Sequence, residues 1–117
     1  MATLANQGMA SQMSFGQHGS GFVDDAGAYV PPDGLVVVAI TCLADTTFTT
    51  LTSEDGTKYF GLAAAGSGTN SEVIDSTNVF PEGITIYGRW TAVTATADSA
   101  GGVICYLGPS KSPIQTA

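Results

Sequence analysis

Short apolar runs bounded by Gly or Pro recur along this chain from about residue 30 onward. The run over 34–44, Gly-Leu-Val-Val-Val-Ala-Ile-Thr-Cys-Leu-Ala, is apolar at consecutive positions, which predicts a central strand covered on both faces. Residues 45–52 alternate more clearly, with Phe48 and Leu51 among threonines. Both runs are rich in β-branched residues, and this composition favours strands over helices.

Residues 53–56, Ser-Glu-Asp-Gly, contain an Asp-Gly pair, which is the strongest short-range signal for a β-hairpin. The pair predicts that residues 57–62 return as the strand beside 45–52. A loop of small residues follows over 63–71, and residues 72–80 are predicted to form a further strand or an extended edge.

The last third of the chain, 80–97 and 101–108, predicts two packed strands joined by a short turn. Because neighbouring strand residues point to opposite faces, Trp90 is expected on the core face. Tyr87 and Arg89 then project together from the other face, which they share with Thr85, Thr91 and Val93. Exposed Tyr and Arg are favoured at protein interfaces, so Tyr87 and Arg89 are candidate partner contacts.

Five or six short strands and no convincing helix predict an all-β fold, either a small β-sandwich or a barrel-like domain. This β-domain is expected over residues 30–108, between an extended N-terminal arm over 1–29 and a polar C-terminal tail over 109–117. Pro109 and Pro113 argue against continuing the sheet into the tail.

The N-terminal segment is rich in Gly, Gln, Ser and Met and has no sustained apolar period. It is either a disordered tail or an arm that becomes ordered along a neighbouring subunit. A solvated tail would not need apolar anchors, which favours the arm. The candidate anchors are Met9, Met13, Phe15, Phe22 and Val23, and the first four of these are candidate partner contacts.

The composition favours a subunit of an assembly over a free monomer. Of 117 residues, 44% are hydrophobic but only 11% are charged, against about 25% in typical domains. A surface with few charges is easily buried against another protein, although an extracellular β-domain with a Thr-rich surface stays an alternative. The net charge of −7 argues against binding to nucleic acid or to an anionic membrane. Neither an export signal nor a membrane span is predicted.

No catalytic, cofactor-binding or metal-ligating set is expected, and therefore no enzyme. The only histidine, His18, lies in the arm without a nucleophile to activate. Two cysteines 63 positions apart and one histidine give no metal-ligand spacing. Cys42 and Cys105 are expected as free, buried thiols, and a disulfide between two layers is the alternative.

The chain combines a C-terminal strand pair with a Pro-Glu-Gly entry at 81–83, a low charge, a richness in Thr, Gly and Ala, and a Gly-rich arm. In these features it resembles small virion structural proteins of tailed bacteriophages. The chain looks most like a capsid decoration (cement) protein. The resemblance implies a non-enzymatic, often trimeric β-module on the outer surface of the capsid, assembled in the host cytoplasm. Its partners would be the major capsid protein or other virion subunits.

The rival interpretation is a head or tail fibre or knob component that acts as an adhesin for a host surface. Such a protein would group exposed aromatic residues beside polar loops. Tyr59, Tyr87 and Tyr106 are the candidates for that grouping.

Overall fold

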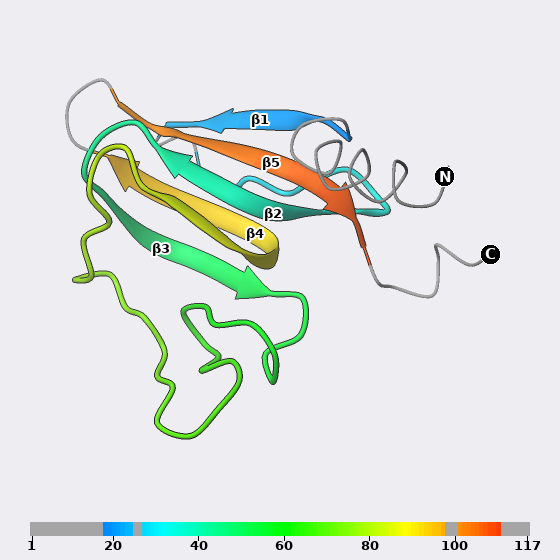
Figure 1. Ribbon diagram of the computed structural model, residues 1–117. Coiled ribbons are helices and arrows are strands. Elements are labelled where there is room, and N and C mark those ends of the chain that lie inside the picture. The colour runs from blue at the N-terminus through cyan, green and yellow to red at the C-terminus, as the bar shows by residue number, and fades with distance from the viewer. Residues whose placement is uncertain (1–17, 25–26, 98–100, 111–117) are drawn as a thin grey trace, which may run out of the picture.

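The computed structural model describes residues 18–24, 27–97 and 101–110, and within them the chain forms five antiparallel strands (Figure 1). Hydrogen bonds join the strands into one open sheet in the order β1-β5-β2-β4-β3. The all-β prediction is confirmed, with one continuous sheet in place of two separate sheets or a closed barrel. None of these described segments is a helix long and apolar enough to cross a membrane. The strands are β1 (Ser20–Val23), β2 (Leu35–Cys42), β3 (Thr46–Ser53), β4 (Thr85–Ala97) and β5 (Val103–Pro109).

β4 is the long strand that shapes the sheet, because it turns back on itself at Trp90. The short connection over 43–45 makes β2 and β3 run in opposite directions (Figure 1), yet β4 is antiparallel to both. Trp90 is paired with Val37 near the start of β2 and with Ser53 at the end of β3. The part of β4 before Trp90 therefore lies beside β2, and the part after it lies beside β3.

An extra residue at the bend changes which side chains of β4 face the core. Opposite β3, Thr52 pairs with Ala92 and Ser53 pairs with Trp90, so Thr91 has no register partner on β3 and forms a bulge. Trp90 and Val93 are consequently both fully buried. The prediction that Trp90 faces the core is confirmed. The placement of Val93 on the outward face is wrong, because simple alternation ends at the bulge.

All five strands contribute side chains to one hydrophobic core. The central strand β2 has buried side chains on both faces, as predicted: Val37 and Ile40 belong to the core, and on the opposite face Ala39 is buried between the larger side chains of its register partners Tyr106 and Tyr87. The long irregular segment over 54–84 contributes four partly buried side chains that pack against this core, Phe60, Leu62, Ile74 and Phe80. The buried members of the core are Val23, Val37, Ile40, Cys42, Phe48, Leu51, Trp90, Val93, Ala95, Val103, Cys105 and Leu107.

The hairpin predicted at the Asp-Gly pair does not form. The Asp55 carbonyl accepts hydrogen bonds from the backbone N–H groups of Lys58 and Tyr59, and its side chain accepts from Thr57. These bonds close a compact turn, and β3 pairs with β4 instead. The segment 72–80 also forms no ladder, and only Phe80 makes a β-bridge, to Thr46.

Two further expectations change once the sheet order is known. β4 and β5 are not paired with each other, because β2 lies between them. The boundary expected at residue 29 moves toward the N-terminus, since residues 20–23 form β1 and pair with β5. Val23 and Tyr29 both pack in or against the core, so the described part of the predicted arm belongs to the folded domain.

Cys42 and Cys105 are free and buried, which agrees with the expectation of free thiols. They lie on neighbouring strands, where Cys105 pairs with Ile40 and Cys42 pairs with Val103. Burial, with a smaller contribution from Cys42, raises the pKa of the Cys105 thiol from its ordinary 9.0 to about 12. A thiolate is therefore strongly disfavoured at this position in the folded protein.

This raised pKa predicts a loss of stability in alkali. Because the pKa of Cys105 is higher in the folded than in the unfolded state, its contribution is complete below pH 9.0 and is lost as the pH rises toward about 12. We expect the free energy of unfolding to fall by about 1.4 kcal/mol between about pH 8 and about pH 10 through this group. Urea unfolding at both pH values, for the native chain and for Cys105→Val, measures it. An equal alkaline loss in both proteins would contradict the assignment.

Candidate functional site

The face of the sheet opposite the core is a regular surface that described residues of β1, β5, β2 and β4 form. Two rows of side chains cross it, each following the cross-strand register. We call this surface the outer face. Its first row is Phe22, Ile104, Thr41 and Thr85, and its second is Ser20, Tyr106, Ala39 and Tyr87.

The outer face is uncharged and carries exposed aromatic residues at its two sides. Phe22 on β1 is 60% exposed and Tyr87 on β4 is 62% exposed. Between them, the hydroxyl oxygens of Thr41 and Thr85 lie 2.9 Å apart in a hydrogen bond. One of these hydroxyl groups donates to the other, so part of the hydrogen-bonding capacity in the middle of the face is met within the protein.

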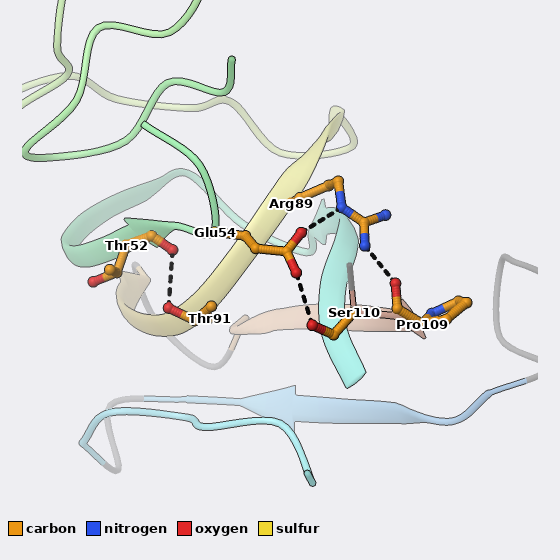
Figure 2. A network of polar contacts seen from close by, with 6 residues as sticks. All are labelled: Thr52, Glu54, Arg89, Thr91, Pro109 and Ser110. Carbon is orange, nitrogen blue, oxygen red and sulfur yellow. Dashed lines mark hydrogen bonds and ion pairs between the residues drawn. The ribbon is translucent and has the colours of Figure 1, made fainter. Parts of the chain in front are cut away.

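Arg89 is the only charged residue within the five strands, and it is paired (Figure 2). Its Nε–H donates to Glu54 Oε1 at 2.6 Å, and its Nη2 donates to the carbonyl of Pro109. Ser110 donates its hydroxyl to the other carboxylate oxygen of Glu54 at 2.8 Å. We call these four residues the Glu54 network.

The Glu54 network fastens one end of the sheet. The Glu54 N–H donates to the Arg89 carbonyl at 2.8 Å, and the Ser110 N–H donates to the Gly34 carbonyl at 2.8 Å. The network thereby joins the end of β3, the bend of β4, the end of β5 and the residue before β2. Both charged side chains are only 14–16% exposed, so the ion pair acts as a structural tie.

A depression lies beside this network, and its lining comes from the irregular segment, from β2, from the part of β4 before the bend and from the end of β5. Its volume is about 420 Å³, and Tyr59 and Tyr87 contribute to its wall. Gly88 and Gly108 leave part of its lining without side chains. The full lining is Val38, Tyr59, Tyr87, Gly88, Arg89, Gly108 and Pro109.

The structure separates the sequence-predicted contact residues into three groups. Met9, Met13 and Phe15 lie outside the described residues. Phe22 and Tyr87 are exposed on the outer face. Arg89 lines the depression with Tyr87, and its largely buried side chain is paired with Glu54, so a partner contact through Arg89 stays a prediction.

Sequence reasoning missed Glu54, which it assigned to a turn. One signal was available: an arginine inside a strand, next to a core tryptophan, needs a carboxylate partner when it is largely desolvated. The chain has ten acidic residues and three basic ones, so composition alone does not identify which carboxylate serves. Glu54 becomes the partner of Arg89 because the bend of β4 brings the end of β3 beside Arg89.

The grouping of tyrosines expected of an adhesin is partly present. Tyr59 and Tyr87 line the same depression. Tyr106 is half-buried and lies across Ala39 from Tyr87 on the outer face. Within the part of the chain that the structure describes, no three His, Cys, Asp or Glu side chains gather as a possible metal site.

These arrangements fit binding through shape and apolar contact. The Glu54 network is a charge-balanced tie, and the outer face offers aromatic and aliphatic side chains with paired hydroxyls. Comparison with protein-family models, with curated proteins and with solved structures finds no match for this chain.

Proposed function

We propose that this protein is a non-enzymatic virion structural protein that decorates a phage capsid and stabilises it by bridging shell subunits. The observation that carries the proposal is the uncharged outer face, with exposed Phe22 and Tyr87 and no charged side chain in its two rows. The partners would be the major capsid protein or other virion subunits, and the protein would act on the outer capsid surface as a homo-oligomer, with a trimer favoured.

Desolvation explains why such a face suits a permanent contact. Burying an unpaired charge costs several kcal/mol as an order of magnitude, whereas burying apolar area gains about 25 cal/mol per Å². The strands contribute one charged side chain, Arg89, which is already paired within the molecule. A partner can therefore cover the outer face without separating a charge from water.

A charge placed on the outer face tests this proposal. Phe22→Asp should weaken binding to capsids that lack the protein by about tenfold or more, because the carboxylate must be desolvated and an apolar contact is lost. Val79→Asp is the matched control, since Val79 is 59% exposed but lies in the irregular segment. Co-sedimentation with such capsids measures the occupancy. Equal binding by both variants would exclude the outer face as the contact.

The second candidate function is a fibre or knob component that binds a host surface. The specific observation in its favour is the depression with Tyr59 and Tyr87 in its lining. Its test is binding of the purified protein to host cells, with Tyr87→Ala compared with Phe22→Ala.

A further inference from the structure

We propose that the depression between Tyr59 and Tyr87 binds an uncharged saccharide. This inference deepens the second candidate function and rests on it, whereas it is independent of the capsid-decoration proposal. The depression has a volume of about 420 Å³. That volume falls within the range of about 300–1,000 Å³ found for small-molecule sites.

The lining supplies the contacts that a sugar ring requires. The faces of tyrosine rings carry partial negative charge, which attracts the C–H groups on the apolar face of a pyranose. Tyr59 and Tyr87 come from different parts of the chain, the irregular segment and β4, and meet at the same depression. Val38 and Pro109 extend its apolar surface.

Hydrogen-bond donors for sugar hydroxyls are also present. A guanidinium group has five N–H donors, and two of those of Arg89 are used by Glu54 and Pro109. These two bonds fix the plane of the guanidinium group at the wall of the depression. A donor group held in place in this way loses little conformational entropy when a ligand binds.

The charge balance selects an uncharged ligand. Glu54 neutralises Arg89 at 2.6 Å, so the depression does not offer an unbalanced cation to a phosphate, a sulfate or a sialic acid. The whole chain has a net charge of −7, which repels anions further. The chemistry of the site thus favours neutral hexoses or N-acetylhexosamines.

Two glycines contribute backbone without a side chain to the lining of the depression. A Cβ atom at Gly108 would lie 2.9 Å from the Val38 side chain, and one at Gly88 would lie 2.6 Å from the Trp90 ring. Side chains at these positions would displace residues that line the site or the core. Gly88, just before the bend of β4, and Gly108, near the end of β5, therefore present backbone on which a ring can lie.

A printed array of neutral glycans and their sialylated or sulfated counterparts tests the proposal, using the full chain. We expect binding to a subset of neutral glycans, a loss of about tenfold or more in Tyr87→Ala and Tyr59→Ala, and no change in Phe22→Ala. Urea unfolding of each variant confirms that the fold is retained.

Three results would overturn the proposal: no glycan bound, binding only to anionic glycans, or binding that survives both tyrosine substitutions. Attachment to host cells is measured separately. Cell attachment without glycan binding would support the adhesin function and reject the saccharide proposal. Glycan binding without cell attachment would support the saccharide proposal and reject the adhesin function.

Discussion

Replacing Trp90 with alanine will destabilise the fold by about 3–5 kcal/mol, which is the range for truncating a large buried aromatic residue. Trp90 is fully buried, its Nε1–H donates to the Phe60 carbonyl at 2.8 Å, and its ring meets Phe60 edge to face at 5.7 Å. It also occupies the bend of β4, where it is paired with β2 and β3. Removing it opens a cavity at the point where the sheet reverses.

Two further variants separate the causes of this loss. Trp90→Phe keeps an aromatic ring but leaves the Phe60 carbonyl without its donor, which should cost about 1–3 kcal/mol. Tyr87→Ala, on the exposed side of the same strand, should change stability by about 0.5 kcal/mol or less. Urea unfolding followed by circular dichroism measures all three. A Trp90→Ala protein as stable as Tyr87→Ala would refute the role of Trp90 as the anchor of the bend.

The second large effect is expected at Glu54. Glu54→Gln removes the charge that balances Arg89 while keeping the shape of the side chain, and we expect a loss of about 2–3 kcal/mol, because a largely buried guanidinium loses its counter-ion. The exposed Glu82, treated in the same way as Glu82→Gln, should change stability by about 0.5 kcal/mol or less.

A double-mutant cycle with Arg89→Met isolates the ion pair from other losses. If Glu54 and Arg89 act as one tie, the double variant should be less destabilised than the sum of the single variants, by about 1–3 kcal/mol. Chemical unfolding of the four proteins supplies the cycle. Strict additivity would mean that the 2.6 Å contact between these side chains contributes no coupling to the fold.

Most strands could be predicted from the sequence because their signals are local. The β-branched runs bounded by Gly and Pro correspond to β2, β3, β4 and β5 within a few residues. The inward position of Trp90 follows from alternation alone. Each of these inferences requires only neighbouring residues and the two-residue period of a strand.

The strand pairing could not be predicted, because it depends on contacts between distant segments. The bulge at Thr91 reverses the facing of Val93, and an alternating pattern gives no warning of one inserted residue. The Asp-Gly pair wrongly predicted a hairpin for a related reason. Asp55 forms a compact turn with the residues that follow it, and β3 pairs with β4, which lies some forty positions later in the chain. The Glu54 network exists only because that pairing brings Glu54 to Arg89.

The binding surface was partly visible in the sequence. The sequence predicts Tyr87 as an outward-facing contact and Phe22 as an apolar anchor of the arm, and both side chains are exposed in the structure. Their place on the outer face, together with Ile104 and the paired threonines, required the order of the strands. The depression beside Arg89 combines residues from four separate segments, so no linear motif indicates it.

The copy number of this chain in purified virus particles tests the capsid-decoration proposal most directly. Quantitative mass spectrometry against the major shell protein gives the ratio. We expect about one copy per shell subunit or per symmetric lattice contact, since a protein that bridges shell subunits follows the repeat of the lattice. A ratio equivalent to a few copies per particle, or absence from the particle, would contradict the proposal.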